Sequence, residues 1–583
     1  MENQLLTVGL LMFFAIIGSV LSAKVKQPAV VGLLIIGMII GPNATNLVTD
    51  SNTINLMIEF GAILFLFIIG MEFSLPQLKK IGGKSLVVAL FKVGIMFFLG
   101  FLLTSLFGMD FITAAFVGVI FSFSSTMIIT NILKQKSFIK KQEVPLLIGV
   151  LVLEDIFGIV ALTFFSVTKN AGISGMVSGI EKLLISLIVM SIIYVIISKF
   201  AENIIKWIMK NTGDEVITLI SLSLCAGFAY IAYLLGLSPS AGAFLAGSLL
   251  STFKESKLFE RSVKPHTILF SSFFFISMGT LINVKAIFDN LFVIILFSIA
   301  IIISLQIAIG VVTRLFADFS KKGAMFASIA MLPPGVFSML VAKESISYGV
   351  SLDLVTITSI IILLMSIVLS LAISKTDKFV IESNKQSIIK VISNKLSTFL
   401  YELDTEHFYS KKIKRRAGLV SMFILGLIIL TTILYEIIIL NINIVLKIFL
   451  LTIISSSMIA LVYFIIKTTK KIFEYTINIF SNLQGGTNIK KTRNFIKHLF
   501  FGLLLLLIGL FFPMFLFVLD KSKLVLIIPV CFVLIGLIMI VKSNNYAKHI
   551  NLEYKYTIHK FKKINVSSKY FLKSTGQVKR NDL

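Results

Sequence analysis

The chain has 583 residues, of which 57% are hydrophobic and 14% are charged, and this composition excludes a soluble globular protein. The formal net charge of +26 could suggest a nucleic-acid partner, but the basic residues lie between apolar stretches, which indicates membrane topology and no nucleic acid. The two cysteines lie within apolar stretches, so no disulfide framework is predicted.

Repeated apolar stretches predict an all-α membrane protein with thirteen spans before residue 376. Their approximate ranges are 5–22, 28–41, 54–71, 85–107, 112–132, 144–168, 180–200, 215–236, 239–251, 265–281, 286–312, 322–343 and 354–375. Basic residues gather in alternate loops, so the N-terminus is expected outside the cell and residue 376 in the cytoplasm.

Glycine and proline patterns recur in the two halves with opposite orientation. The second and ninth spans each carry two glycines five residues apart after a proline, namely Pro28, Gly32 and Gly37, and Pro239, Gly242 and Gly247. A phenylalanine-to-glycine stretch also recurs, at 65–70 and 274–279. This pattern predicts an inverted repeat, which is typical of transporters, although chance is an alternative because packed transmembrane helices are rich in glycine.

Two spans carry helix-breaking residues at matching depth. The twelfth contains Pro333, Pro334 and Gly335, and mid-helix prolines remove backbone donors and leave carbonyl groups free. The fifth contains a polar centre at 122–126, whose hydroxyls can bond their own backbone. Two broken helices would present free carbonyls at mid-membrane, where a cation can bind. The alternative for 122–126 is ordinary hydrogen bonding between helices.

Two adjacent acids, Glu154 and Asp155, lie in the apolar stretch 145–162. Glu154 is about 14 Å into this helix, halfway through a hydrocarbon core of about 30 Å. Each carboxylate there costs roughly 3 kcal/mol, so a functional role is expected. The side chains leave the helix about 100° apart, which predicts unequal roles. The alternative is a buried, satisfied pair that fixes helix packing.

A proton and an alkali cation would compete for such carboxylate oxygens. If only the loaded form can move, because an unpaired charge is costly in lipid, this competition becomes obligatory exchange. Other charged residues are expected at water-accessible ends. We expect Glu59 to be solvated at the interface, Lys92 to extend to the cytoplasmic face, and Lys343 and Glu344 to lie at the outer rim.

Five motifs together resemble the monovalent cation:proton antiporter-2 family, which includes sodium/proton antiporters and glutathione-gated potassium efflux systems. They are PAVVGLLIIGMIIGP at 28–42, FLFIIGMEF at 65–73, SFSSTMIIT at 122–130, LVLEDIFGI at 151–159 and AGAFLAGSLLS at 241–251. The resemblance covers residues 1 to about 375. It implies a homodimer with a thirteen-helix fold, in which a mobile core bears two crossed, broken helices. It also implies that Asp155 carries the cation (Na⁺ or K⁺) and the proton, with Ser125 and Thr126 at the break; Ser124 and Glu154 complete the predicted site.

The chain also departs from that family's pattern. Val336 follows the double proline where the family usually has a glutamate, and Gln306 occupies the position where electrogenic relatives carry a lysine. These departures favour one-for-one exchange. The alternative is that Glu154 supplies a second proton and titrates together with Asp155.

The resemblance ends near residue 375, which divides the predicted antiporter domain (1–375) from three further segments. Residues 376–417 predict a basic, amphipathic cytoplasmic linker, 418–541 an additional membrane module with spans at 418–440, 444–466, 498–519 and 523–541, and 542–583 a basic cytoplasmic tail. No nucleotide-binding motif is found, so no nucleotide-binding domain and no cofactor are expected.

The sequence therefore predicts a secondary antiporter, not an enzyme, that exchanges Na⁺ or K⁺ for H⁺ across the plasma membrane by alternating access. A passive cation channel is one alternative, in which the same acids form an open path. A non-transporting scaffold or sensor built on a transporter fold is another, suggested by the altered twelfth span and the extra helices.

Overall fold

The computed structural model describes residues 2–72, 83–168, 185–200, 205, 215–253, 256–379, 501–510 and 527–548, with isolated positions between 415 and 498. Within these residues the elements are helical, apart from a single antiparallel bridge between Ser124 and Pro334. The predicted all-α class is therefore confirmed for this part of the chain.

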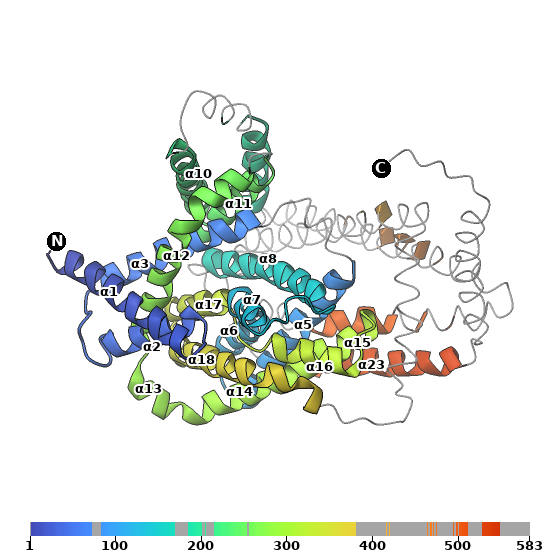
Figure 1. Cartoon of the computed structure of the whole chain (residues 1–583). Helices are drawn as coiled ribbons and strands as arrows, with labels where there is room; N and C mark the ends of the chain where they lie inside the picture. The colour runs from blue at the N-terminus through green and yellow to red at the C-terminus, as the bar shows by residue number, and fades with distance from the viewer. Residues whose placement is uncertain are drawn as a thin grey trace, which may run out of the picture.

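The helices before residue 380 form two groups (Figure 1). The first helix group contains α1 (Glu2–Lys24), α2 (Ala29–Ile40), α3 (Ser51–Glu72), α10 (Glu215–Leu234), α11 (Pro239–Ser251) and α12 (Ser256–Thr280). In this group α3 packs against α11 and α12, and α2 packs against α1 and α12. These contacts bring together helices that are far apart in the sequence.

The second helix group holds the broken helices. It contains α5 (Gly83–Leu106), α6 (Phe111–Ser122), α7 (Thr126–Gln135), α8 (Val144–Thr168), α13 (Val284–Asp289), α14 (Leu291–Leu305), a π-helical turn (Gln306–Val311), α15 (Val312–Phe316), α16 (Lys321–Ala330), α17 (Val336–Ser347) and α18 (Leu354–Ala372), which continues as a 3₁₀ turn (Ile373–Phe379). Here α5 packs against α6 and α8, and α17 packs against α6, α8 and α18. The two groups meet where α8 contacts α11 and where α2 contacts α18.

Glycines of the repeated pattern lie at the close contacts of the first helix group. A Cβ added to Gly37 of α2 would lie 2.2 Å from the carbonyl oxygen of Ile276 in α12, and one added to Gly247 of α11 would lie 1.9 Å from that of Phe67 in α3. No side chain fits in these contacts. The glycines therefore allow backbones to approach closely, as small residues do in membrane helix bundles.

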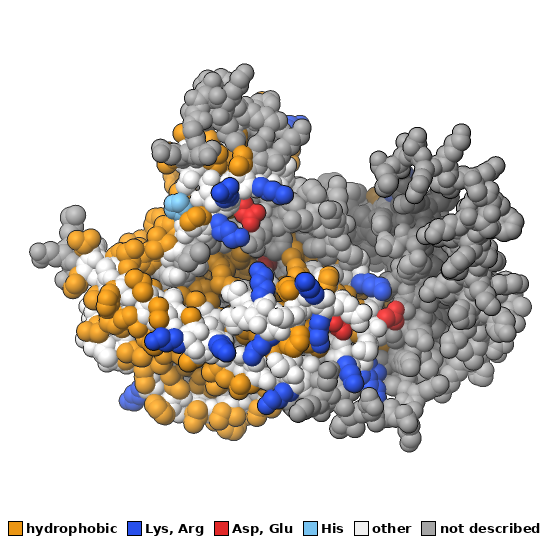
Figure 2. Space-filling model, viewed as in Figure 1, with side chains coloured by type: hydrophobic (Ala, Val, Ile, Leu, Met, Phe, Trp, Pro, Cys, Tyr) orange, Lys and Arg blue, Asp and Glu red, His pale blue; other side chains and the backbone are white. Residues whose placement is uncertain are grey.

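Seven described helices are long and apolar enough to cross a membrane, and several shorter apolar helices accompany them. Large apolar side chains are exposed along α1 and α14, among them Phe13, Ile16, Phe292 and Ile299. In Figure 2 apolar side chains cover much of the described surface at the left of the view, whereas Lys and Arg side chains lie mainly across its middle. A soluble monomer rarely exposes so much apolar surface, so the protein is a multi-pass membrane protein.

The fifth and twelfth spans are each divided into two helices, at the predicted breaks. Other helices differ from the predicted spans in two details. Helix α12 begins at Ser256 and continues through Pro265, where the span was expected to begin. The eleventh span contains the π-helical turn that starts at Gln306.

The predicted linker 376–417 and tail 542–583 fall almost entirely outside the described residues. Two helices within the predicted C-terminal module are described, at 501–510 and in α23 (Ile527–Lys548). Leu506 and Leu510 are buried in the same apolar cluster as residues of α5, α6 and α14.

Candidate functional site

The two helix breaks face each other and are joined through their backbones. Between α6 and α7, the N–H of Ser125 donates to the carbonyl oxygen of Pro333 at 2.8 Å. Between α16 and α17, the N–H of Gly335 donates to the carbonyl oxygen of Phe123 at 3.1 Å. Breaks predicted from separate sequence signals thus form one structural unit.

Local chemistry explains why the helices stop at these residues. Pro333 and Pro334 have no N–H to continue α16. On the other chain segment, the Ser125 hydroxyl caps α7 by accepting from the N–H of Ile128 at 3.3 Å. A Cβ on Gly335 would lie 2.7 Å from the carbonyl oxygen of Ser124, so glycine is needed where the breaks approach.

Two serine hydroxyls strengthen the link between the breaks. Ser338 of α17 donates to the carbonyl oxygen of Ile120 at 2.7 Å and satisfies a carbonyl at the end of α6. The Ser124 hydroxyl donates to the carbonyl oxygen of Met331 at 3.0 Å, just after α16 ends. The polar centre of the fifth span therefore bonds its own helix and the opposite break.

Helix α8 carries the acid pair to this unit. Glu154 has 0% and Asp155 has 4% of its surface exposed, so neither side chain points into lipid. The Thr126 hydroxyl, at the first residue of α7, donates to Asp155 Oδ2 at 3.2 Å. Asp155 lies about 17 Å along α8 from Val144, at the middle of this helix.

Lys92 of α5 lies inside the protein, and the expectation that it extends to the cytoplasmic face is wrong. Its side chain is fully buried, and its ammonium group is 2.8 Å from Glu154 Oε2. It also donates to the carbonyl oxygen of Ser122 at 2.6 Å and to the Ser124 hydroxyl at 2.9 Å. A buried carboxylate and the end of α6 supply the negative charge that makes burial of this lysine tolerable.

The adjacent acids have unequal surroundings, as the helix geometry predicts. Glu154 Oε2 accepts from Lys92 and from the backbone N–H of Ser124, the latter at 2.8 Å. Glu154 Oε1 is buried and accepts no hydrogen bond within the described part of the chain. Glu154 is thus an ion-paired anchor of the break with one oxygen left for a further donor or cation.

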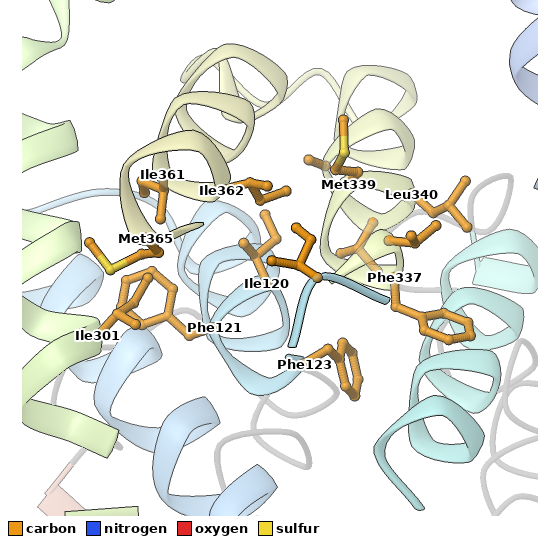
Figure 3. Close-up of a cluster of buried hydrophobic side chains, with 14 of the residues drawn as sticks. Ile120, Phe121, Phe123, Ile301, Phe337, Met339, Leu340, Ile361, Ile362 and Met365 are labelled. Atoms are coloured by element: carbon orange, nitrogen blue, oxygen red, sulfur yellow. The ribbon is translucent and has the colours of Figure 1, made fainter. Parts of the chain in front are cut away.

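The helix crossing is the place where the break between α6 and α7 meets the break between α16 and α17. An apolar shell encloses it. Figure 3 shows side chains of α6, α14, α17 and α18 converging around it, including Ile120, Phe121, Met339 and Ile362. The rings of Phe123 and Phe337 meet edge to face with centroids 6.2 Å apart. Such a shell lowers the local polarity, so the charges inside interact more strongly than they would in water.

The remaining residues singled out by sequence lie near the crossing or in contact with it. Val336 begins α17 and is buried at the break where the family usually has a glutamate. Gln306 starts the π-helical turn and approaches α16: a Cβ on Gly310 would lie 3.4 Å from Gln306 Oε1 and 2.9 Å from the Ser328 hydroxyl. The buried lysine of this site is instead supplied by α5.

A multi-pass membrane protein in which buried acids meet two interrupted helices belongs to the class of secondary transporters. The transmembrane model of the sodium/hydrogen exchanger family matches residues 9–376, so the chain is a member of that family. The resemblance to monovalent cation:proton antiporters is confirmed, and the family is one of transporters rather than enzymes.

Curated relatives are similar over the same part of the chain. K(+) efflux antiporter 5 of Arabidopsis thaliana is 27% identical over 57% of this chain and 59% of its own length. Na(+)/H(+)-K(+) antiporter GerN of Bacillus cereus is 26% identical over 60% of this chain and 89% of its own. K(+)/H(+) antiporter subunit KhtU of Bacillus subtilis is 25% identical over 63% and 92%. The chain therefore spans less than two thirds of the plant relative.

Among solved structures, the sodium proton antiporter MjNhaP1 of Methanocaldococcus jannaschii matches with a TM-score of 0.49 and 15% identity. The match covers 68% of this chain and 99% of that one.

Proposed function

We propose that this protein exchanges a monovalent alkali cation, Na⁺ or K⁺, for H⁺ at Asp155, by alternating access. The observation that carries the proposal is the position of Asp155: buried at mid-helix, bonded to Thr126 at the start of α7, and next to the ion-paired Glu154. The relatives described above are K⁺ efflux, Na⁺/H⁺-K⁺ and K⁺/H⁺ antiporters, which supports this cation class.

Charge balance supports exchange of one proton for one cation. Lys92 and Glu154 cancel each other, so the empty site carries the single negative charge of Asp155. Either a proton or an alkali cation neutralises this charge, and the two cannot occupy the same oxygens together. An uncompensated charge is costly inside a membrane, so only the loaded forms would cross between the two access states. A second proton on Glu154 would leave the ammonium of Lys92 as an uncompensated buried charge, so Glu154 would not take part in the exchange.

Each predicted site residue has a distinct role in this mechanism. Asp155 and Thr126 supply cation ligands, and Glu154 Oε1 is a buried acceptor that a partly dehydrated cation or a water molecule could satisfy. Ser124 and Ser125 hold the break open beside Asp155. Pro333, Pro334 and Gly335 keep the opposite break from closing into a continuous helix.

We extend the proposal to the assembly and its orientation. The alternation of basic loops favours an N-terminus outside the cell and a cytoplasmic C-terminus, in the plasma membrane. The paired glycine contacts and the two breaks support a thirteen-helix inverted repeat, and a homodimer is the expected assembly for this family. The four C-terminal spans would form a regulatory or dimer-supporting module, which packs against the antiporter domain at Leu506 and Leu510.

Vesicles containing the full chain and an internal pH dye test the function. External pulses of NaCl or KCl should drive cations into the wild-type vesicles and protons out of them, so the interior becomes more alkaline and the dye signal changes. Asp155→Asn should abolish the signal, and Asp289→Asn, at the exposed end of α13, should leave it unchanged. Uptake of labelled cation against its gradient, driven by a proton gradient, should likewise occur in the wild type and in Asp289→Asn and be absent in Asp155→Asn.

Three results would contradict the proposal. Equal rates in wild type and Asp155→Asn would remove the site assignment. Cation flux that runs only down the cation gradient would favour the passive channel. No response to any alkali cation, in protein that stays folded, would favour a scaffold or sensor.

A further inference from the structure

An ion pair outside the candidate site joins the two helix groups. The Lys343 ammonium of α17 lies 3.7 Å from Glu59 Oε1 of α3. Helix α17 packs within the second group, against α6, α8 and α18, whereas α3 packs within the first, against α11 and α12. The pair therefore connects elements whose other main partners lie on opposite sides of the boundary between the groups.

Glu59 and Lys343 each lie nearer the helix end that is predicted to face the outside than the opposite end, and Lys343 is about 10 Å along α17 from Val336 at the break. Glu59 is about 12 Å along α3 from Ser51, and Lys343 is about 6 Å before the last residue of α17. Both helix ends belong to the predicted outer side of the protein. The contact is thus placed where the groups would part if the site opened to the outside.

Its geometry differs from that of the pair in the candidate site. Lys92 and Glu154 are 2.8 Å apart, and their side chains are 0% and 1% exposed. Lys343 and Glu59 are 3.7 Å apart and are 20% and 66% exposed. A buried pair cannot separate without leaving an unpaired charge, but a partly exposed pair of long side chains can separate and re-form.

We propose that Lys343 and Glu59 form a conformational latch that holds the helix groups together on the outer side and opens in each transport cycle. This inference rests on the proposed alternating access. A latch of this kind stabilises one access state and contributes nothing once the groups have separated, so it sets the balance between the states. Glu59 is then more than a solvated acid at the membrane interface.

Cross-linking tests the latch directly. In a background with Cys225→Ala and Cys531→Ser, the full chain carries Glu59→Cys and Lys343→Cys and is treated in vesicles with a short bis-methanethiosulfonate. Bridging the groups should lower exchange at least tenfold, and dithiothreitol should restore it. The control pair, Glu260→Cys and Lys264→Cys, lies one turn apart on α12, so its cross-link should leave exchange unchanged.

Charge variants provide an independent measurement. Glu59→Gln and Lys343→Gln should each shift the apparent KM for the cation, roughly twofold to fivefold and in the same direction. The exchanged pair, Glu59→Lys with Lys343→Glu, should return it toward the wild-type value. Full exchange by a protein whose cross-link is verified by mass spectrometry would overturn the latch, as would charge variants that match the wild type.

A readout that does not need transport separates this inference from the proposed function. Spin labels at Leu56 of α3 and Ile346 of α17, both exposed, report the distance between the groups. The distance distribution should broaden in Glu59→Gln even if the protein moved no cation, and an unchanged distribution would overturn the latch. Absence of exchange in the uncross-linked wild type would instead count against the proposed function.

Discussion

Lys92 shows how a single buried cation can define the roles of two neighbouring acids. It contacts Glu154, the Ser124 hydroxyl and the carbonyl oxygen of Ser122, so it joins α5, α8 and the break after α6. The ion pair with Lys92 ties Glu154 to the structure of the break. In the proposed mechanism the exchanging group is instead Asp155, which is bonded to the neutral hydroxyl of Thr126.

Removing Lys92 should destabilise the protein more than removing the whole pair. Lys92→Met leaves Glu154 buried and unpaired, which should cost about 3 to 5 kcal/mol, whereas Lys92→Met combined with Glu154→Gln should recover most of the loss. Thermal unfolding in detergent, monitored by size-exclusion chromatography, ranks the stabilities of the variants. A double variant no more stable than Lys92→Met would contradict the pairing.

The Ser124 hydroxyl should matter more than other buried hydroxyls. It accepts from Lys92 and donates to the carbonyl oxygen of Met331, so Ser124→Ala should cost about 1 to 3 kcal/mol of stability. Ser298→Ala is the matched control, since that buried hydroxyl has no hydrogen-bond partner among the described residues. The control should be neutral or stabilising; equal melting temperatures for both variants would contradict the role of Ser124.

Most residues of the candidate site can be predicted from the sequence, because each is energetically unfavourable in its local setting. Two carboxylates in an apolar stretch and two prolines in mid-helix indicate Glu154, Asp155 and Pro334. Lys92 does not stand out in the sequence, because one lysine, nine residues into a helix, is also suited to extend to the membrane surface. Its partner is 62 residues away in the chain, and only tertiary packing reveals it.

At the scale of helices, backbone contact explains the glycines that recur in the two halves. Gly37 of α2 meets α12, and Gly247 of α11 meets α3, in contacts too close for any side chain. The sequence pattern indicates which glycines matter, but it does not reveal their partners. The partners depend on packing between elements that are distant along the chain.

A methyl group at Gly247 should weaken the first helix group. Gly247→Ala places a Cβ 1.9 Å from the carbonyl oxygen of Phe67, so α3 and α11 must separate, at a cost of about 1 to 3 kcal/mol. Gly227→Ala in α10 is the control, because nothing lies within 4 Å of its added Cβ and alanine favours the helix. Melting temperatures should fall for the first variant and stay level or rise for the second; a fall of equal size in both would contradict the packing argument.

Element boundaries were less predictable than element type. Pro265 marked the expected start of a span, but α12 begins nine residues earlier and passes through it. The turn before a membrane-embedded proline can retain its helical form when neighbouring groups satisfy the freed carbonyl. The double proline at 333–334 follows the end of α16, because neither residue has an N–H to continue the helix, and the N–H of Ser125 in the opposite break satisfies the carbonyl oxygen of Pro333.

At the scale of the whole molecule, the two groups of described helices meet along a few contacts, and one of the groups contains the charged centre. The centre belongs to the second group, because α5, α6, α8 and α17 all pack there. Relative movement of the groups would therefore carry the acid pair, the breaks and Lys92 together. In the proposed exchange, the charge balance of this unit would decide how many protons accompany each cation.

The null point of exchange is the most direct test of this balance. Vesicles are held at zero membrane potential while imposed cation and proton gradients are varied until no net proton movement occurs. With Asp155 as the exchanging group and Glu154 fixed by Lys92, the flux should vanish when the proton concentration ratio equals the cation concentration ratio. A null point at the square root of the cation ratio would mean that two protons move per cation, and would contradict the assignment of Glu154 to the structure of the site.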